Sequence, residues 1–515
     1  MEGNESYLTQ DELNRVKPLV VAIVGPTNEG KTSILRTLTN DPEFGCVNAY
    51  TGTTIRAEMQ RVFCRGAAEI LQLIDTPGFQ TSSEILENVT ENSLAQDQDG
   101  EFTLADILAA IPTEDEDFRH DLRAWREIEK CDVVMFVANI AEDPRRSLLK
   151  STITLLQHIG KPTLVAYNNL GVQGDEGGTC ADFRKEWDAT LFQKSFFLVQ
   201  CYDAHRRVFS DEVALFEKLV ALSRDPLTRR VLRMELEDRK ARERRRLEES
   251  RQIIAELLLD VATCRYEASN VDSSQVQDSL KKLQGRLTEG VMRRELKAQA
   301  ELLKTWGFKP SVLNRELLQV EEETKEEEDR SEQLKRGASL GATIGATVGL
   351  AADIALAGLS LGVGTAIGAA LGGALGGGAS IYGAKYDKSR KRLSLRVSEG
   401  VLKATLAREV SLVHHLQTRG KAMEDSVVIR IPAHPSNQIE LPIFWKELRD
   451  AAERRDFSSM SERKVATENL GAKLKGLADL KRATSLLTGA PLKTRDDVIQ
   501  TLSAELRKAL PDFVS

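Results

Sequence analysis

Apolar and polar positions alternate along the first 210 residues in blocks that predict strands and helices in turn. Between these strands, Ser33–Leu38 and Ser147–His158 have the three- and four-residue apolar spacing of helices. Strands that alternate with helices form parallel sheets with right-handed crossovers, so we expect an α/β domain over residues 15–210, after a tail of residues 1–14. The runs with the pattern of strands are Pro18–Val24, Ile55–Cys64, Ala68–Ile74, Asp132–Ala138, Thr163–Asn168 and Ser195–Gln200.

The periodicity of residues 211–335 predicts packed helices. Leu227–Arg251 mixes acidic and basic residues at helical spacing, which favours a long solvated helix with i,i+4 ion pairs. Its basic centre, Arg239–Arg246, would also suit anionic lipid or RNA. Ile253–Val261 is an apolar stripe, and leucines recur at helical spacing between residues 280 and 303.

Residues 337–384 form a glycine-rich segment in which Asp353 is the one charged residue. Every-fourth spacing places glycines in one stripe of a helix, where a second helix can approach closely, as helices do in lipid. Basic residues flank both ends, so we expect a membrane hairpin with both ends on the cytoplasmic side. A soluble glycine-rich hairpin or a linker is the alternative. The periodic glycines are Gly337, Gly341, Gly345 and Gly349, then Gly364, Gly368, Gly372 and Gly376.

Residues 386–515 are predicted to form a mainly helical C-terminal domain. Leu393–Gln417 has the pattern of an amphipathic helix. Ser426–Ile431 and Ile439–Trp445 resemble two short strands. This part of the sequence contains no recognisable catalytic constellation, and we expect it to bind a partner or to pack against the rest of the chain.

Composition narrows the class of protein. The chain has 515 residues, of which 41% are hydrophobic and 29% charged, so several folded domains are expected. A net charge of −7 argues against a general nucleic-acid binder. The six cysteines are scattered without a CxxC pair, which favours a reducing cytoplasm over a disulfide framework or zinc site. The polar start, Met1–Glu5, lacks the pattern of a signal peptide.

The stretch Gly25–Thr32 fits the pattern GxxxxGK[ST] between a predicted strand and a predicted helix. In that setting the backbone N–H groups of the loop cradle phosphate oxygens, and the helix N-terminus favours negative charge. Lys31 is expected to reach the β- and γ-phosphates, and the Thr32 hydroxyl to ligate Mg²⁺. The expected nucleotide-binding residues of this loop are Gly25, Pro26, Thr27, Asn28, Glu29, Gly30, Lys31, Thr32 and Ser33.

Two later motifs complete a candidate catalytic set. Asp75-Thr76-Pro77-Gly78 follows a strand, so Asp75 is expected to hold Mg²⁺ through water and the Gly78 N–H to sense the γ-phosphate. In Gly52-Thr53-Thr54, Thr54 is the preferred residue to complete the Mg²⁺ shell, and Thr53 is the second choice. Lys31, Thr54 and Gly78 are therefore the predicted catalytic residues.

Residues 80–128 are predicted to be an insertion. The segment is largely polar, and Glu114–Asp117 is acidic, so a solvated mobile loop is expected. The functional alternative is an extension of the switch region that docks a partner when nucleotide is bound.

The order of these motifs resembles the Era and TrmE group of translation-factor-class (TRAFAC) GTPases. The resemblance covers about 200 residues, or two-fifths of the chain. It implies a P-loop fold, GTP and GDP as ligands, Mg²⁺ as cofactor, and hydrolysis of GTP to GDP and phosphate. It also implies that Asn28 matches the P-loop asparagine that helps bind K⁺ in some members. A similar architecture occurs in poorly characterised bacterial GTPases with a glycine-rich segment before a C-terminal domain of unknown role.

Two positions depart from the usual GTPase pattern. Where the family reads guanine with Asn-Lys-x-Asp, this chain has Asn168-Asn169-Leu170-Gly171, so Asn168 and Asn169 remain candidates but weaker guanine discrimination is expected. Phe79 stands where many GTPases have a water-orienting glutamine, and Gln80 is expected to point elsewhere on an extended chain. We therefore expect slow hydrolysis that needs a cation, a partner or self-association.

These observations predict a slow GTPase switch coupled to a membrane-associated helical region on the cytoplasmic face of the inner membrane. Its expected partners are inner-membrane lipid or a membrane protein, and a second copy of the chain through the glycine stripes. One alternative is a nucleotide-binding membrane or oligomeric scaffold with little turnover. Another is a ribosome- or RNA-associated Era-like GTPase, which the acidic balance disfavours.

Overall fold

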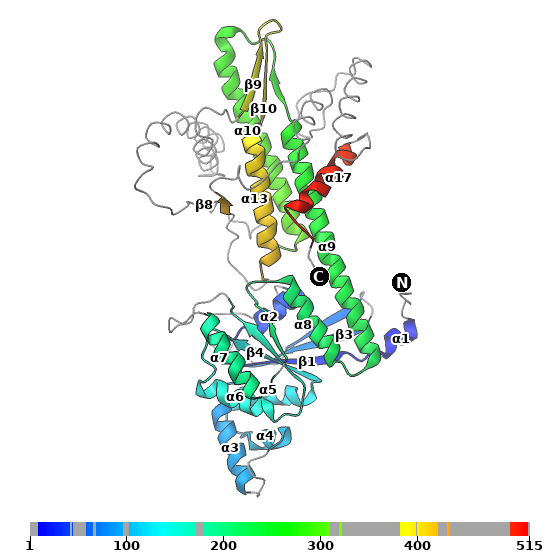
Figure 1. The fold of residues 1–515 in the computed structure, drawn as a ribbon, viewed down its shortest axis with the longest axis vertical. Coiled ribbons are helices and arrows are strands. Elements are labelled where there is room, and N and C mark those ends of the chain that lie inside the picture. The colour runs from blue at the N-terminus through cyan, green and yellow to red at the C-terminus, as the bar shows by residue number, and fades with distance from the viewer. Residues whose placement is uncertain are drawn as a thin grey trace, which may run out of the picture. The chain divides into compact units, whose positions relative to one another are not determined.

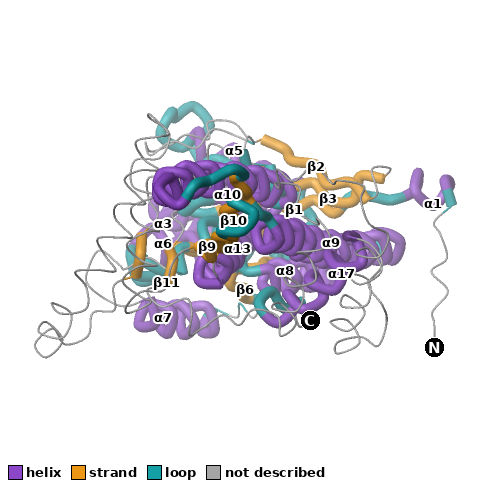
Figure 2. Tube along the Cα trace, turned by 90° about the horizontal axis from the view of Figure 1, so that it is seen from above, coloured by secondary structure: helices purple, strands orange, loops and turns teal. Residues whose placement is uncertain are grey.

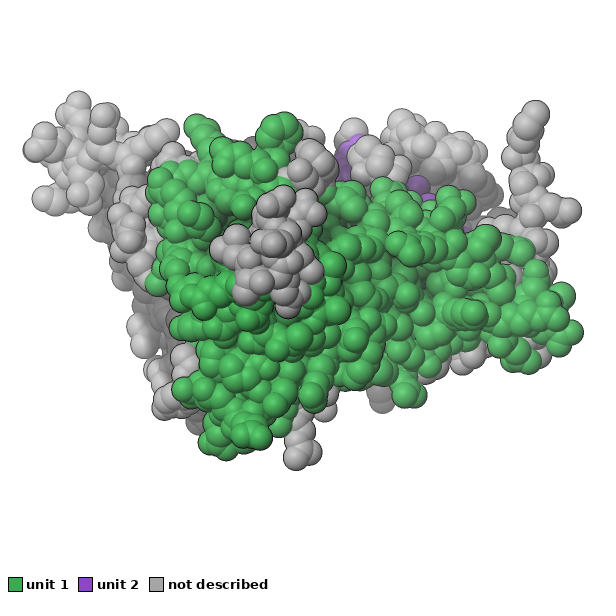
Figure 3. All heavy atoms as spheres, turned by 90° about the horizontal axis from the view of Figure 1, so that it is seen from below, with its two compact units in different colours: residues 1–242, 417–423, 515 green, residues 243–416, 424–514 purple. Residues whose placement is uncertain are grey.

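The described part of this computed structural model divides into two compact units. Unit 1 comprises residues 1–242, 417–423 and 515, and unit 2 comprises residues 243–416 and 424–514 (green and purple in Figure 3). Thr53, Thr54 and Gly171 lie outside the described residues. The structure describes residues 9–41, 44, 58–64, 68–95, 102–170, 180–194, 196, 198–309, 319–321, 382–397, 399–420, 430–432 and 495–512.

A six-stranded sheet forms the centre of unit 1 and confirms the predicted α/β class (Figure 1). Every neighbouring pair is parallel except β2 and β3. The parallel strands are almost continuously apolar, as expected for strands that are covered on both faces. In order across the sheet, the strands are β2 (Glu58–Cys64), β3 (Ala68–Asp75), β1 (Leu19–Val24), β4 (Val133–Asn139), β5 (Thr163–Asn168) and β6 (Val199–Cys201).

Helices cover both faces of this sheet because successive strand residues point to opposite sides. On one face, Val21 and Ile23 of β1 join a core formed with α2 (Lys31–Thr39), α8 (Phe209–Leu222) and the start of α9 (Pro226–Thr263). On the other face, Ala22 and Val24 join a second core. The helices that contribute to this second core are α3 (Ser82–Ala95), α4 (Leu104–Ala110), α5 (Arg119–Lys130), α6 (Ser147–Gln157) and α7 (Cys180–Gln193).

The expectation of a solvated mobile loop over residues 80–128 is wrong for the described residues. They form α3, α4 and the first part of α5, which pack into the second core of unit 1. Ile85, Val89 and Ile107 are buried there, and Trp125 is fully buried. A few large apolar side chains at helical spacing anchor this segment, although most of its residues are polar.

Unit 2 contains helices and a three-stranded antiparallel sheet in the order β7-β10-β9. Figure 2 labels two of these strands, β9 and β10. The prediction of a helix over Leu393–Gln417 is wrong at its start, because residues 392–397 form a strand before the helix begins at Glu399. Alternate side chains of that strand, Leu393, Leu395 and Val397, are buried, which is the period of a strand. The elements are α10 (Val276–Thr305), α13 (Glu399–Thr418), α17 (Arg495–Glu505), β7 (Tyr266–Ala268), β9 (Tyr382–Asp387) and β10 (Arg392–Val397).

Several short elements complete the described chain. They are α1 (Gln10–Arg15), the 3-10 turns Ser273–Gln275 and Leu506–Lys508, and the parallel pair β8 (Gln319–Glu321) and β11 (Arg430–Pro432). The predicted strand at Ile439–Trp445 lies outside the described residues.

The glycine-rich segment also lies outside the described residues, except for residues 382–384. Those three residues belong to β9 and not to a helix. Within the described ranges, no helix combines the length and the apolar character that crossing a membrane requires.

Candidate nucleotide-binding site

The loop between β1 and α2 has the backbone of a phosphate-binding loop. Gly25, Asn28 and Gly30 have positive φ angles of 152°, 69° and 85°. Gly30 is the N-cap of α2, and a Cβ on it would lie 2.4 Å from Asn168 Nδ2, so no larger residue fits. Asparagine tolerates the left-handed region at position 28. Strand, loop and helix N-terminus therefore follow in the arrangement that directs N–H groups at an anion.

Lys31 lies across this loop. Its Nζ donates to the carbonyl oxygens of Gly25 at 3.2 Å and Pro26 at 2.7 Å, and the residue is 6% exposed. Burial lowers the pKa of Lys31 from its ordinary value, and the carboxylate of Asp75 opposes this shift most strongly. The ammonium group thus occupies the loop that would receive the phosphates.

Thr32 and Asp75 meet at the carboxyl end of the sheet. The Thr32 hydroxyl donates to Asp75 Oδ2 at 2.5 Å, and both residues are buried. Thr32 is on α2 and Asp75 ends β3, 43 positions later in the chain. A hydroxyl and a carboxylate are hard oxygen donors of the kind that Mg²⁺ prefers, so this pair fits the predicted ion.

The segment after Asp75 runs directly beside the phosphate-binding loop. Thr76 Oγ1 donates to the Ile23 carbonyl at 2.7 Å, and the Phe79 N–H donates to the Gly25 carbonyl at 3.0 Å. A Cβ on Gly78 would lie 2.5 Å from the Thr27 Cα, so this contact requires glycine. The structure therefore places Gly78 beside the phosphate-binding loop, which is the position that the predicted role of γ-phosphate sensor requires.

Phe79 and Gln80 differ in their surroundings. Phe79 is fully buried and stacks on Trp125, with ring centroids 5.3 Å apart. Gln80 is exposed, and its Nε2 donates to Thr27 Oγ1 at 3.3 Å. The expectation that Gln80 points away from the site is wrong, because its side chain turns back over the loop.

Asn168 connects the phosphate-binding loop to a second loop at the same edge of the sheet. Its Nδ2 donates to the Glu29 carbonyl at 2.8 Å, and its Oδ1 accepts from the Ala204 N–H at 2.9 Å. The side chain is fully buried. Asn169 follows with a positive φ of 60° and is half-buried. Asn168 thus has a clear positioning role between the two loops.

The loop of residues 203–207, here called the base-side loop, was not identified from the sequence. Asp203 accepts the Leu170 N–H on one carboxylate oxygen at 2.8 Å and the His205 N–H on the other at 2.8 Å. This carboxylate holds the chain just before Gly171, where the family's base-reading aspartate is missing. The signal in the sequence was an Asp-Ala pair three residues after the predicted strand Ser195–Gln200, which is too common to be diagnostic.

Glu29 is the unusual residue of the phosphate-binding loop. It is 2% exposed, and its Oε2 has no hydrogen-bond partner among the described residues. Burial and the nearby Glu142 raise the pKa of Glu29 to about 8. The side chain therefore carries a proton at neutral pH, which avoids a buried negative charge beside the phosphates.

A short segment at the end of α13 pairs with the base-side loop within unit 1. The Arg207 N–H donates to the Thr418 carbonyl at 2.8 Å, and the Gly420 N–H donates to the His205 carbonyl at 2.9 Å. Between these bonds, Arg206 and Arg419 form an antiparallel bridge. A Cβ on Gly420 would lie 1.8 Å from the Ala204 carbonyl oxygen. Residues 417–420, here called the docking segment, therefore contact the loop that holds Asn168.

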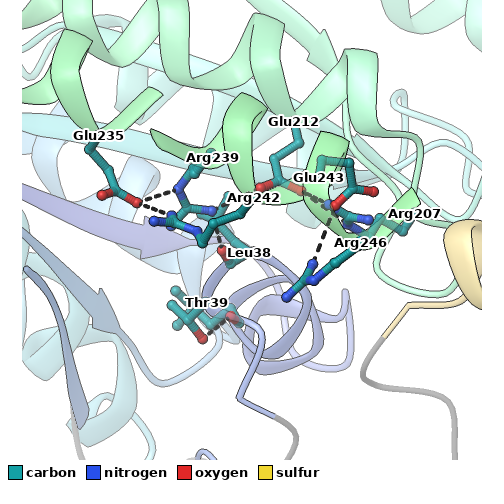
Figure 4. A network of polar contacts seen from close by, with 10 residues as sticks. Leu38, Thr39, Arg207, Glu212, Glu235, Arg239, Arg242, Glu243 and Arg246 are labelled. Carbon is teal, nitrogen blue, oxygen red and sulfur yellow. Dashed lines mark hydrogen bonds and ion pairs between the residues drawn. The ribbon is translucent and has the colours of Figure 1, made fainter. Parts of the chain in front are cut away.

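A buried ionic network joins α2, α8 and α9 (Figure 4). Arg239 Nη1 lies 2.8 Å from Glu212 Oε1 and donates to the Leu38 carbonyl at 3.0 Å. Arg207 of the base-side loop pairs with the same Glu212 at 3.0 Å. Burial raises the pKa of Glu212, but the two arginines outweigh it and hold that pKa below its usual value. Glu235 of α9 is 3% exposed, so the prediction of a solvated helix is wrong for this face.

Two protein families match this chain. A family described as "50S ribosome-binding GTPase" matches residues 20–169, and a family described as "Domain of unknown function (DUF3482)" matches residues 189–476, more than half of the chain. No curated protein matches the chain.

Solved structures of GTPases match with low overall similarity. Era in complex with MgGDPNP and nucleotides of 16S ribosomal RNA is 17% identical, with a TM-score of 0.28, over 56% of this chain and 89% of that one. An Era variant from Aquifex aeolicus bound to GDP and AlF₄⁻ is 16% identical, with a TM-score of 0.28, over 57% and 90%. Toc33 from Arabidopsis thaliana with Mg²⁺ and GMPPNP is 14% identical, with a TM-score of 0.25, over 38% and 78%.

The first match coincides with β1, the phosphate-binding loop, the Asp75–Gly78 segment and Asn168. It confirms that residues 20–169 form a GTPase domain, which binds guanine nucleotide. The second match covers most of the remaining chain, including α9, α10 and α13. The chain therefore belongs to the DUF3482 family and carries a GTPase domain over residues 20–169.

Proposed function

We propose that this protein is a GTPase switch that couples nucleotide binding to its C-terminal DUF3482 region. The observation that carries this proposal is the pairing of the docking segment with the base-side loop. That loop binds Asn168, and Asn168 binds the carbonyl of Glu29 in the phosphate-binding loop. A continuous chain of hydrogen bonds thus leads from the nucleotide site to residues that directly extend α13.

The residues of the GTPase domain have defined roles in this proposal. The loop N–H groups bind the phosphates, and Lys31 exchanges its two carbonyl partners for the β- and γ-phosphate oxygens. Thr32 and Asp75, whose side chains meet at 2.5 Å, would hold Mg²⁺. The bound ion would supply positive charge that stabilises the negative charge developing on the phosphates during hydrolysis.

The helix α9 supplies a second connection to the C-terminal region. Its first residues, up to Arg242, pack in unit 1, and the same helix continues into unit 2. Arg239 binds the last turn of α2 through the Leu38 carbonyl, while Arg207 joins Glu212 to the base-side loop. A shift of α2 or of this loop would therefore disturb a buried ionic network, in which an unpaired partner costs several kcal/mol.

The coupling can be tested with one glycine. Gly420→Ala places a Cβ 1.8 Å from the Ala204 carbonyl oxygen and must break the pairing. Gly285→Ala on α10 is the matched control, because a Cβ there meets nothing within 4 Å. Calorimetry on the full chain should show at least a fivefold change in nucleotide affinity for Gly420→Ala, a typical allosteric coupling, and none for the control. Wild-type affinity in a folded Gly420→Ala chain would contradict the proposal.

We further propose that residues 337–384 associate with the cytoplasmic face of the inner membrane, through lipid or a membrane protein. Their glycine stripes and basic flanks support this, and the same stripes would suit self-association. The test is a deletion of residues 337–381, which leaves β9 intact. The full chain should float with anionic phosphatidylglycerol vesicles, and the deletion should not, while both bind GTP. A full chain that stays with the soluble fraction would refute the membrane role.

Ribosome association is a second candidate function, because the matching GTPase family is described as ribosome-binding. It predicts that the full chain sediments with 50S subunits in the presence of a non-hydrolysable GTP analogue. Sedimentation that is lost at moderate salt and does not depend on nucleotide would speak against it.

A further inference from the structure

We propose that Gln80 is the catalytic glutamine of this GTPase and orients the water that attacks the γ-phosphate. The inference rests on GTP hydrolysis at the P-loop. Phe79, at the usual position, is apolar and fully buried, so it cannot hold a water. Gln80 is exposed and its amide reaches Thr27 of the phosphate-binding loop at 3.3 Å.

The backbone on both sides of Gln80 is fixed. Before it, the Phe79 N–H binds the Gly25 carbonyl, and the Phe79 ring stacks on Trp125. At Gln80 and after it, the N–H groups of Gln80 and Thr81 donate to Asp121 Oδ2 at 3.0 and 3.3 Å. Asp121 is fully buried on α5, so it forms a rigid acceptor. The backbone of Gln80 is therefore held in place. A fixed backbone of this kind preorganises the side chain that it carries, as a water-orienting group needs.

The amide of Gln80 lies at the γ-phosphate end of the site. Gly78, whose N–H is predicted to sense the γ-phosphate, packs directly on Thr27. The Gln80 amide binds the hydroxyl of that same Thr27. With GTP bound, the Gln80 amide can release the Thr27 hydroxyl and bind the attacking water and a γ-phosphate oxygen instead. These new partners would lie close to the position of that hydroxyl.

Hydrolysis in this arrangement needs no reactant besides GTP and water. The water oxygen forms a bond to the γ-phosphorus while the bond from that phosphorus to the β–γ bridging oxygen breaks, and GDP leaves with the electron pair. The Gln80 carbonyl oxygen accepts a hydrogen bond from the water, and its amide N–H donates to a γ-phosphate oxygen. The proton that the water loses passes to the released phosphate.

Asp121 has a positioning role in this arrangement. Its Oδ2 already accepts two backbone N–H groups, and the residue is fully buried, so it does not reach the water itself. It determines where the Gln80 side chain begins. The packing of α5, which belongs to the helical insertion, thereby becomes part of the catalytic geometry.

Single-turnover hydrolysis by the full-length chain tests the role of Gln80. Gln80→Ala should lower the rate about 100-fold, the scale of one oriented catalytic side chain, with the affinity for a non-hydrolysable GTP analogue unchanged within about twofold. Gln157→Ala, at an exposed glutamine that ends α6, is the control and should keep the wild-type rate. A Gln80→Ala rate within twofold of wild type would overturn the inference while leaving the GTPase intact.

A second pair of variants separates positioning from folding. Asp121→Ala should lower the rate without changing KM, and Asp121→Asn should restore most of it because an amide oxygen can accept the Gln80 N–H. Equal rates for Asp121→Ala and wild type would overturn the positioning role. If the wild-type chain binds GTP but does not hydrolyse it in K⁺, the proposed GTPase activity is refuted, and the proposed role of Gln80 is refuted with it.

Discussion

The protonated glutamate in the phosphate-binding loop makes a measurable prediction about stability. Glu29→Gln replaces the buried carboxylic acid by a neutral side chain of the same shape. The ordinary pKa of a glutamate is 4.5, and that of Glu29 is about 8 in the folded protein. Because the folded protein holds this proton more tightly than the unfolded chain, the stability is greatest below pH 4.5 and falls as the pH rises toward 8.

The size of the effect follows from the two pKa values. Each pKa unit corresponds to about 1.4 kcal/mol, so wild-type stability should fall by about 3 kcal/mol between low pH and pH 7, and by about 5 kcal/mol above pH 8. Glu29→Gln has no proton to lose. The variant should therefore exceed wild type by about 3 kcal/mol in the free energy of unfolding at pH 7, and the difference should vanish near pH 4.5.

Hydrogen exchange of the full-length chain can measure this difference locally. Protection of the peptides that span β1 and α2 should be compared between wild type and Glu29→Gln at each pH from 5 to 9, so that intrinsic exchange rates cancel. The variant should gain protection steadily across this range and level off near pH 8. Equal protection at every pH would show that Glu29 is ionised in the folded protein, and would refute this account of the loop.

Three further predictions concern the site and the core of unit 2. Lys31→Ala should abolish GTP binding in calorimetry while the chain stays folded, because the ammonium group bonds to carbonyls of the phosphate-binding loop rather than packing in the core. Hydrolysis should be faster in K⁺ than in Na⁺ at matched ionic strength, and Asn28→Ser should remove the difference in a phosphate-release assay. Arg408 makes a buried bidentate pair with Glu295 at 2.6 and 2.9 Å, so Arg408→Met should cost about 3–5 kcal/mol in urea unfolding, and adding Glu295→Gln should recover most of it.

The parts of the site that were predictable from sequence are those whose chemistry is local. The phosphate-binding loop needs glycines at positions of positive φ, a lysine and a hydroxyl within eight consecutive residues, and Gly25–Thr32 supplies them. Asp75 and Gly78 were recognisable because Asp-Thr-Pro-Gly directly follows a mainly apolar strand. In each of these cases the physical requirement falls on neighbours in the chain, and the structure brings these residues together.

Other features depend on burial, which charge and polarity patterns do not reveal. The insertion was misread because its helices have polar outer faces and bury only a few large side chains, such as Ile85 and Trp125. Glu235 lies in the stretch Leu227–Arg251 that was predicted to be a solvated helix with i,i+4 ion pairs, but it is buried and pairs with Arg239 and Arg242. The strand Arg392–Val397 did carry a period of two, and the helical signal that follows it obscured this.

The contact between the docking segment and the base-side loop joins residues that are more than 200 positions apart, and it depends on backbone groups. Backbone hydrogen bonds leave almost no trace in side-chain composition, apart from a glycine such as Gly420 where two chains approach closely. No reading of a single sequence could place that glycine against Ala204. This is why the connection between the GTPase domain and the C-terminal region emerged only from the structure.

The position of this contact determines which signal it can carry. A ligand shifts the equilibrium between two conformations of a protein only if it interacts differently with each of them. The guanine base is the same in GTP and GDP, so a contact near the base cannot distinguish the two nucleotides. The docking segment touches the loop held by Asn168 and not Gly78, the predicted γ-phosphate sensor. Gly420→Ala should therefore change the affinities for GTP and GDP by the same factor, measured by parallel calorimetric titrations. A change confined to GTP would show instead that the C-terminal region senses the γ-phosphate, through the segment that follows Asp75.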